Sequence, residues 1–129
     1  MKKLWGVIAG LVSAFIVVFA LEMISHLIYP PPAISDPTDY VAMGELLKLA
    51  PLGSLLIVVF GHFLAMFVGT VITLKITKEK SAAYIVIGLF VLLTAMNLYM
   101  IKHPMWFVIS DMAAVILGGG LPYLAFKNK

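Results

Sequence analysis

Four long apolar runs occupy most of this sequence, and they restrict its fold more than any other feature. A helix that crosses a membrane needs about 20 mainly apolar residues, because each residue advances it by about 1.5 Å through a hydrocarbon layer of about 30 Å. Four segments qualify, at about residues 4–29, 51–74, 82–101 and 104–126. The sequence therefore predicts an all-α, integral membrane four-helix bundle, with residues 1–129 forming a single transmembrane domain.

The amino-acid composition argues against a water-soluble domain of this length. Hydrophobic residues make up 63% of the 129 residues and charged residues only 12%, against about 45–50% and about 25% in soluble proteins. A chain this short has too small an interior to hide that much apolar side chain from water. Cysteine is absent, which excludes disulfides and thiolate chemistry, and arginine is absent too. Because the lysines flank the apolar runs, the net charge of +3 indicates membrane topology and no nucleic-acid partner.

Prolines and short polar segments mark the ends of the runs. Pro30–Pro32 end the first run, because proline has no amide hydrogen to continue a helix. Pro51 and Pro104 suit the first turn of a helix, where a missing donor costs nothing. Lys75–Ser81 is too polar for hydrocarbon and predicts a short turn, and Ile101–Pro104 predicts a tight hairpin between the last two spans.

The lysines predict which way the bundle faces. An even number of spans places both termini on one side of the membrane, together with the connection between the second and third spans. That side carries seven lysines: Lys2, Lys3, Lys75, Lys78, Lys80, Lys127 and Lys129. The other side carries only Lys48 and Lys102. Since cytoplasmic loops carry the excess of positive charge, both termini are expected in the cytoplasm.

The first run has a second interpretation as a cleaved signal peptide. Lys2 and Lys3, an apolar stretch and the small residue Ala20 have the general form of such a signal. The apolar run continues through Leu27 and Ile28, however, which is longer than a typical signal core. We therefore expect it to be retained as the first span.

The outer connection between the first two spans predicts a short amphipathic helix at about residues 37–49. Asp36 is a suitable N-cap, Pro37 fits the first helical position, and Asp39 favours the positive end of the helix dipole. One face of this helix is apolar, formed by Tyr40, Val41, Met43, Leu46, Leu47 and Ala50. We expect the helix to lie on the outer surface or to cap the bundle; an ordered but inert linker is the alternative.

Small residues recur at four-residue intervals in three of the spans. Such residues line one helix face and let a second backbone approach closely. The stripes are Gly6, Gly10 and Ala14, then Gly61, Ala65, Gly69 and Thr73, then Ala114 and Gly118. They join helices either within one chain or between chains, and a small bundle of four spans favours a homo-oligomer or a membrane partner. Pro122, near the cytoplasmic end of the last span, predicts a kink there.

The ionisable side chains within the apolar runs all lie between the outer surface and the middle of the membrane, together with one amide side chain. They are Glu22 and His26 in the first span, His62 in the second, Asn97 in the third, Asp111 in the fourth, and His103 at the outer hairpin. At 1.5 Å per residue, Glu22 and Asp111 lie roughly 10 Å deep, with His62 near the midplane. Glu22 and His26 share a helix face at a spacing of four and are expected to pair, with Asp111 and His62 completing a cluster.

Three functions fit such a cluster, because polar groups in a membrane usually face inward and pair. The first is structural: hydrogen bonds hold the helices of an accessory subunit in register. The second is an outward-facing polar pocket that binds or moves a proton, a cation or a small solute. The third is a metal or haem site ligated by His26, His62 and His103, with Glu22 or Asp111 as a carboxylate ligand, although the sequence requires no cofactor.

An enzyme is the least favoured class. Ser25 and Ser110 are available as nucleophiles, but neither lies in the G-x-S-x-G context that activates a serine at a nucleophile elbow. Trp106 follows the His-Pro pair of the outer hairpin and fits either an interfacial anchor or a lid over a pocket. The sequence therefore favours a non-enzymatic membrane protein over a catalyst.

Two segments resemble a group of small bacterial four-span inner-membrane proteins. The segments are LEMISHLIYPPP (Leu21–Pro32) and IKHPMWF (Ile101–Phe107). The matching positions are Glu22, His26, Pro30, His103, Pro104 and Trp106. The resemblance implies a bacterial inner (plasma) membrane and a four-span topology, and it implies no particular activity.

Overall fold

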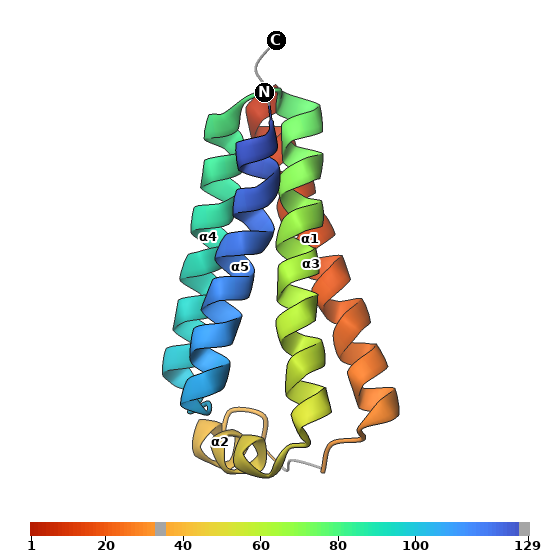
Figure 1. Cartoon of the computed structure of the whole chain (residues 1–129), viewed down its shortest axis with the longest axis vertical. Coiled ribbons are helices and arrows are strands. Elements are labelled where there is room, and N and C mark those ends of the chain that lie inside the picture. The colour runs from red at the N-terminus through yellow and green to blue at the C-terminus, as the bar shows by residue number, and fades with distance from the viewer. Residues whose placement is uncertain (33–35, 127–129) are drawn as a thin grey trace.

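The structure, a computed structural model, describes residues 1–32 and 36–126, and all the regular secondary structure in those residues is helical. The helices are α1 (Lys2–Ile28), α2 (Tyr40–Leu49), α3 (Leu52–Thr77), α4 (Lys80–Met100) and α5 (Met105–Ala125). Four of them are long and pack side by side as a bundle, with α2 at one end (Figure 1). This confirms the predicted all-α architecture and the short helix between the first two spans.

The four long helices are long and apolar enough to cross a membrane. They contain 27, 26, 21 and 21 residues, and their most apolar windows have mean hydropathies of 2.6, 2.5, 2.0 and 1.6. Many large apolar side chains point outward from the bundle, such as Phe19, Phe60, Leu92 and Ile109, which are each more than half exposed. In water this surface would be costly, whereas lipid tails are its natural solvent. The chain is therefore a polytopic membrane protein in contact with the bilayer.

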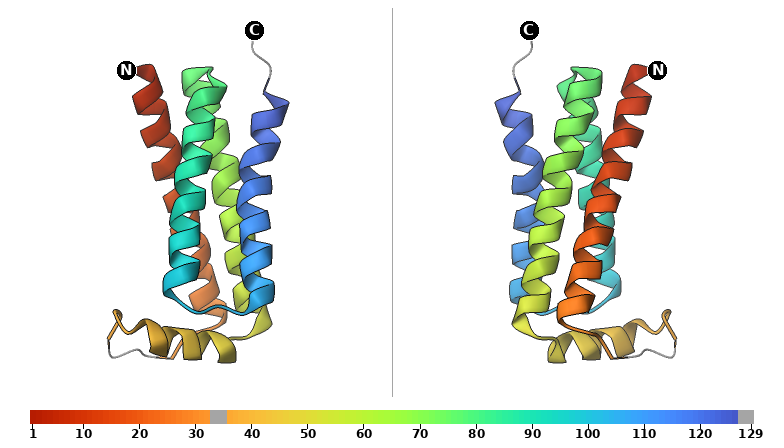
Figure 2. Two further views of the ribbon diagram at one scale, coloured as in Figure 1. Left: turned by 90° about the vertical axis from the view of Figure 1, so that its left-hand side faces the viewer. Right: turned by 90° about the vertical axis from the view of Figure 1, so that its right-hand side faces the viewer.

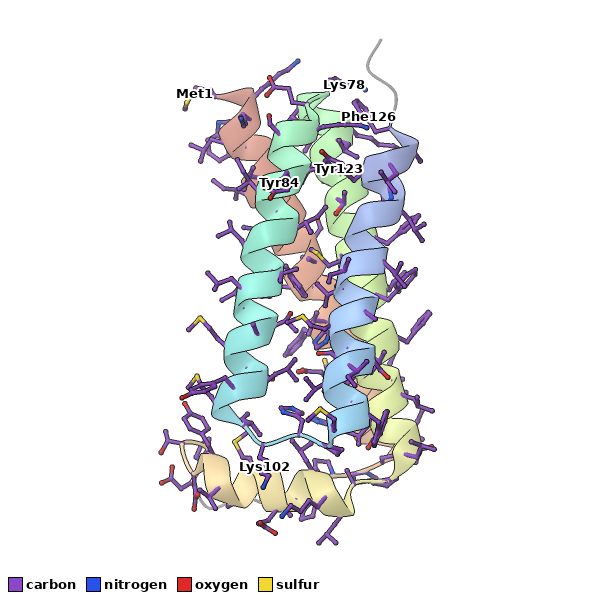
Figure 3. All side chains as sticks on the ribbon, turned by 60° about the vertical axis from the view of Figure 1, so that its left-hand side comes forward. Met1, Lys78, Tyr84, Lys102, Tyr123 and Phe126 are labelled. Carbon is purple, nitrogen blue, oxygen red and sulfur yellow. The ribbon has the colours of Figure 1, made fainter. Side chains whose placement is uncertain are left out.

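The long helices run alternately up and down, so the start of α1 and the end of α5 lie at the same end of the bundle (Figure 1). Helix α2 runs across the opposite end, at a steep angle to the others (Figure 2). Lys78, between α3 and α4, lies at the end that holds the termini, and Lys102, between α4 and α5, lies beside α2 (Figure 3). We refer to the end that carries α2 as the α2 end.

Small residues bring α1 and α3 into close contact near the terminal end. A methyl group built on Gly10 would overlap the hydroxyl of Thr73 and lie 2.7 Å from the carbonyl oxygen of Gly69. The Thr73 hydroxyl donates hydrogen bonds to the carbonyl oxygens of Gly6, at 3.0 Å, and Gly69, at 2.9 Å. The predicted stripes thus join helices within one chain. Gly118 plays the same part on α5, where an added methyl would overlap the backbone carbonyl of Phe63.

The predicted start of α2 was wrong by three residues. Asp36 does not cap the helix, because its carboxylate accepts hydrogen bonds from the amide and hydroxyl of Thr38, at 2.9 and 2.7 Å. This local turn uses the acceptor that a cap would need. Asp39 is the N-cap instead, and its Oδ1 accepts a hydrogen bond from the amide of Ala42 at 3.0 Å.

The connection between α3 and α4 is also shorter than the predicted turn. Helix α3 continues to Thr77 and α4 begins at Lys80, which leaves only two residues between them. The chain reverses because Lys78 adopts a left-handed conformation, with φ 59°, and its amide donates to the carbonyl of Leu74 at 2.9 Å. The polar residues at the end of α3 and the start of α4 are therefore helical. They lie where the bundle meets the membrane–water boundary, and their lysine side chains extend to water.

Candidate polar cavity

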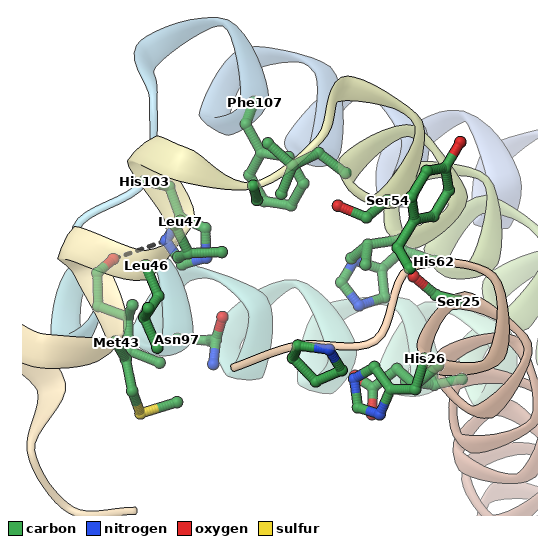
Figure 4. Close-up of a pocket in the computed structure, with 18 of the residues that line it drawn as sticks. Ser25, His26, Met43, Leu46, Leu47, Ser54, His62, Asn97, His103 and Phe107 are labelled. Carbon is green, nitrogen blue, oxygen red and sulfur yellow. Dashed lines mark hydrogen bonds between the residues drawn. The ribbon is translucent and has the colours of Figure 1, made fainter. Parts of the chain in front are cut away.

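A cavity of about 740 Å³ lies at the α2 end of the bundle. Its walls come from all four long helices, and α2 and the proline segment Pro30–Pro32 contribute to its outer end (Figure 4). Each of the four long helices contributes at least one apolar side chain to the lining: Val18 on α1, Val58 on α3, Phe90 on α4 and Phe107 on α5. Its polar lining residues include Glu22, Ser25, His26, Tyr29, Ser54, His62, Thr94, Asn97 and His103. Ligand sites in proteins have this size and this mixture of apolar walls with a few polar groups.

Regular spacing along α1 and α4 explains how those helices build the cavity. Val18, Glu22 and Ser25 on α1 follow one another by three or four residues, so they face the same way. Phe90, Thr94 and Asn97 on α4 repeat that spacing from the opposite wall. Each helix therefore turns one stripe toward the cavity and leaves its remaining faces to lipid or to neighbouring helices.

His62 and Asp111 form the most buried polar contact of the cavity wall. Nδ1 of His62 on α3 lies 2.5 Å from Oδ1 of Asp111 on α5. The Asp111 side chain is 2% exposed and the His62 side chain 18% exposed, and only His62 lines the cavity. When Asp111 is ionised, its carboxylate can only accept, and Nδ1 of His62 then carries the hydrogen of this contact. The pair ties α3 to α5 and fixes the orientation of the imidazole ring.

His103 is held in a similar way at the outer end of the cavity. Its Nδ1 lies 2.6 Å from the carbonyl oxygen of Ile101, which can only accept, so this nitrogen also carries a hydrogen (Figure 4). Its ring stacks on Phe107, with ring centroids 5.0 Å apart. Stacking and the hydrogen bond together set the plane of the ring at the start of α5.

Glu22 and His26 line the cavity from α1, and the pair expected between them does not form. No hydrogen bond or ion pair joins their side chains in the described structure, and both residues are exposed. A four-residue spacing brings two side chains to one helix face but does not fix the rotamers that would let them meet. Glu22 instead shares with His62 the wall of a narrow gap between α1 and α3. The acidic side chain of α1 thus lies on the same side of the cavity as the His62–Asp111 pair.

The other predicted site residues divide between the cavity and the lipid side. Asn97 on α4 lines the cavity. Trp106 does not line it; this side chain is 39% exposed and meets Phe107 edge to face, with centroids 6.0 Å apart. Ser25, Ser54 and Thr94 line the cavity but were not among the predicted site residues. Their helical spacing from Glu22, His62 and Asn97 is the sequence signal that identifies them.

The described lining of the cavity contains a negatively charged residue type and no lysine. Glu22 is the single Asp, Glu or Lys residue among the described residues that line the cavity. Lys48 on α2 points its ammonium group at Glu45, at 3.2 Å, and neither residue lines the cavity. Glu22 thus lines this space with no lysine among the described lining residues, and the rings of Phe15, Tyr29, Phe90 and Phe107 line the same space.

The histidines do not assemble into a metal centre. Within residues 1–32 and 36–126, no three His, Asp or Glu side chains lie close enough together to hold a metal ion. The predicted ligands His26, His62 and His103 come from α1, α3 and the α4–α5 hairpin, and two of them already use Nδ1 in a hydrogen bond. The metal or haem interpretation therefore gains no support from this arrangement.

An apolar layer lies beneath the cavity, toward the terminal end. Ala65 and Met66 on α3, Val86 on α4 and Val115 on α5 are completely buried and pack in one cluster with Ala14 on α1. Met66 follows His62 by one helical turn, and Val115 follows Asp111 by one turn. The layer therefore separates the polar cavity from the terminal end of the bundle.

No family model, no curated protein and no solved structure matches this chain. The resemblance to small bacterial four-span proteins stays a prediction. The function must therefore be argued from the cavity itself.

Proposed function

We propose that this membrane protein binds a small organic cation with an apolar body in the cavity at the α2 end. The observation that carries the proposal is the cavity of about 740 Å³, whose lining, within the described part of the chain, has Glu22 as its one carboxylate and contains no lysine. This carboxylate attracts a bound cation, whereas it would repel an anion of the same shape, and no lysine of the described lining would offset that repulsion. The remaining walls offer apolar and aromatic contacts to the body of the ligand.

The aromatic rings of the lining strengthen the preference for a cation. Phe15 and Phe90 lie with ring centroids 6.0 Å apart, and Phe90 also meets the ring of His62 edge to face. Tyr29 and Phe107 stand toward the outer end of the same cavity. The face of an aromatic ring carries partial negative charge and attracts a cation within about 6 Å. Carboxylate and rings thus favour the same class of ligand.

The lysine distribution supports an outward-facing cavity. Among described residues, Lys2, Lys3, Lys75, Lys78 and Lys80 belong to the terminal end. Lys48 and Lys102 belong to the α2 end. By the positive-inside rule the terminal end faces the cytoplasm, and the cavity faces the outside of a bacterial inner membrane. The homo-oligomer or membrane partner expected from the sequence also stays a prediction.

The test compares two probes of one shape and opposite charge. Phenylbutylammonium and phenylbutyrate are titrated into the protein in lipid nanodiscs, followed by calorimetry, with protein-free nanodiscs as the blank. We expect the ammonium ion to bind and the carboxylate to bind far more weakly. Glu22→Gln is expected to weaken ammonium binding by about tenfold, since a charged hydrogen bond contributes roughly 1.5 kcal/mol or more.

Glu45→Gln is the matched control for the loss of charge. Glu45 lies on α2, its side chain is 66% exposed, and it pairs with Lys48 outside the cavity. Its substitution removes the same charge from the same end of the protein and should leave binding unchanged. Equal affinity of wild type for both probes, or equal losses in Glu22→Gln and Glu45→Gln, would refute the proposal.

Movement of the ligand or of a proton across the membrane is a further step that requires the bundle to open. The completely buried side chains of Met66, Val86 and Val115 close the path beneath the cavity. A ligand can bind from the α2 end without any rearrangement of this apolar layer, whereas transport requires the side chains of the layer to separate. Cation or proton flux in liposomes, compared between wild type and Glu22→Gln, distinguishes a binding protein from a transporter.

A structural role is the second candidate, and the His62–Asp111 contact favours it. This pair joins α3 to α5 at 2.5 Å across the middle of the bundle, as polar side chains in membrane proteins often do. If that were its whole role, substitutions of the pair would lower stability and affect all cavity ligands equally. The probes described below separate this outcome from a role in ligand recognition.

A further inference from the structure

In two lining histidines, the hydrogen bond made by one ring nitrogen decides whether the other nitrogen donates to a ligand or accepts from it. His103 uses Nδ1 to donate to the carbonyl of Ile101, and His62 uses Nδ1 to donate to Asp111 when that carboxylate is ionised. A neutral imidazole has one donor and one acceptor nitrogen. In both rings, therefore, Nε2 is the acceptor when the ring is neutral. Two separate contacts have selected the same tautomer.

The Nε2 atom of His62 is open to a ligand. It has no hydrogen-bond partner within the described residues, and it is not among their buried unpaired polar atoms, of which the hydroxyl of Thr70 is the single example. Asp111 lies behind the ring and outside the cavity lining, so the exposed part of the ring faces the cavity. A lone pair is thus presented to this space from the middle of the bundle.

Two further groups add acceptors to the same space. The carboxylate of Glu22 is acceptor-only when ionised. The hydroxyl of Ser54 already donates to the carbonyl oxygen of Pro51, at 2.7 Å, so its oxygen is left to accept. With Glu22 and Asp111 ionised, these lining groups are acceptors, contributed by α1, by α3 and by the α4–α5 hairpin.

We propose that the cavity selects cations that carry several N–H donors, namely primary ammonium ions with an aromatic or aliphatic tail, over quaternary ammonium ions. The inference rests on the proposed function and specifies its ligand class. A primary ammonium offers three hydrogens, which can reach the Glu22 carboxylate and the Nε2 atom of His62. Asp111 serves as a positioning residue, because it holds His62 in the tautomer that accepts.

A quaternary ion is the competing ligand, since the aromatic rings of the lining can attract any cation. Such an ion has no N–H group, however, and it would cover Nε2 of His62 and the Glu22 carboxylate without replacing their hydrogen bonds to water. A polar group buried without a partner weakens binding. The acceptors therefore favour the primary ion, although both ions carry the same charge.

The experiment compares phenylbutylammonium with its N,N,N-trimethyl derivative on wild-type protein in nanodiscs. We expect the primary ion to bind about tenfold to hundredfold more tightly, the effect of one charged hydrogen bond. Equal affinities, or tighter binding of the trimethyl ion, would overturn the inference and leave the proposed function standing. If neither ion binds, both the function and the inference fail.

Asp111→Asn tests the positioning role. An asparagine can either accept from Nδ1 of His62 or donate to it, so the tautomer is no longer fixed. We expect the preference for the primary ion to fall while the affinity for the trimethyl ion stays the same. A purely structural role would lower both affinities together, which would overturn the assignment.

Nitrogen NMR of the imidazole rings reads the tautomer directly. The sequence has three histidines, so single His→Gln variants assign every ring signal. At about pH 8, where histidine is usually neutral, His62 and His103 should show hydrogen on Nδ1, and Asp111→Asn should change His62 alone. A wild-type His62 with hydrogen on Nε2 would overturn the inference without any ligand.

A second variant serves if Asp111→Asn does not fold. His103→Phe removes the other Nε2 acceptor and should also reduce the preference for the primary ion. An unchanged preference would contradict the inference.

Discussion

Gly10 offers a sharp test of the packing that holds α1 in the bundle. A methyl group at this position would lie 2.7 Å from the carbonyl oxygen of Gly69 and would overlap the hydroxyl of Thr73. Ordinary contacts begin at 3.4 Å, so α1 and α3 would have to separate by about 0.7 Å at this point. The separation would also stretch the hydrogen bond from Thr73 to the carbonyl of Gly6, now 3.0 Å long. Overpacking of this kind costs about 1–3 kcal/mol.

The matched control is Gly88→Ala on α4, where nothing lies within 4 Å of an added methyl. Both variants add one methyl group to a glycine inside a membrane-spanning helix, so they differ only in what the methyl meets. Unfolding by sodium dodecyl sulfate, followed by circular dichroism in mixed micelles, gives the free energy of unfolding for each. We expect Gly10→Ala to lose about 1–3 kcal/mol and Gly88→Ala to lose less than about 0.5 kcal/mol.

A second substitution shows whether the backbone contact causes the loss. Thr73→Ala removes the hydroxyl that a methyl on Gly10 would overlap, but the carbonyl of Gly69 stays in place. The double variant should therefore recover only the part of the loss that the hydroxyl overlap causes, and the part caused by the Gly69 carbonyl should remain. If Gly10→Ala proves as stable as Gly88→Ala, the close contact between α1 and α3 does not exist in the membrane and the reasoning fails.

Three further predictions follow from individual contacts. His62→Ala leaves the buried carboxylate of Asp111 without its partner and should lower the free energy of unfolding by about 3–5 kcal/mol, while His62→Ala with Asp111→Ala should regain part of that loss in the same assay. Because the chain has no cysteine, Lys48→Cys and Glu79→Cys report topology: in intact cells a membrane-impermeant maleimide should label the first and not the second, and the reverse pattern would invert the proposed orientation. The pKa of Asp36 lies below its ordinary value of 3.8, because the hydroxyl and then the amide of Thr38 donate to its carboxylate. Its turn should therefore persist above that value and be lost as the pH falls through the lowered pKa; a Thr38 amide NMR signal that does not move in acid would contradict this.

The spans could be predicted from the sequence because hydropathy over about 20 residues depends on composition alone. Prolines and charged residues then bounded each helix to within three residues of its observed ends, as with Thr77 and Lys80 around the second turn. The capping of α2 could not be predicted in the same way, because Asp36 and Asp39 are both good caps. The choice depended on Thr38, which takes the carboxylate of Asp36 into a turn.

Five of the predicted site residues line one cavity, whereas the contact that forms between helices was not predictable. These residues are Glu22, His26, His62, Asn97 and His103, and the sequence spacing already places them in the half of the spans nearest the α2 end. Sequence spacing favoured a contact between Glu22 and His26, whereas the contact that forms joins residues 49 positions apart. That contact depends on how far α3 and α5 are rotated about their axes. The spacing of two residues within one helix does not show which faces of two other helices meet.

The two halves of the bundle differ because their residues differ in size. In the terminal half, Gly6 and Gly10 let α1 approach α3 to the distance of backbone contact, and near the middle of the bundle Gly118 does the same for α5 against Phe63. In the half that carries α2, the helices instead present Phe15, Phe90 and other large side chains across an open space. Four straight helices that touch at one end separate at the other when the spacers there are bulkier. The glycine contacts therefore act on the cavity from a distance: a variant that pushes α1 and α3 apart near Gly10 would also change the wall that carries Glu22, without altering any residue that a ligand meets.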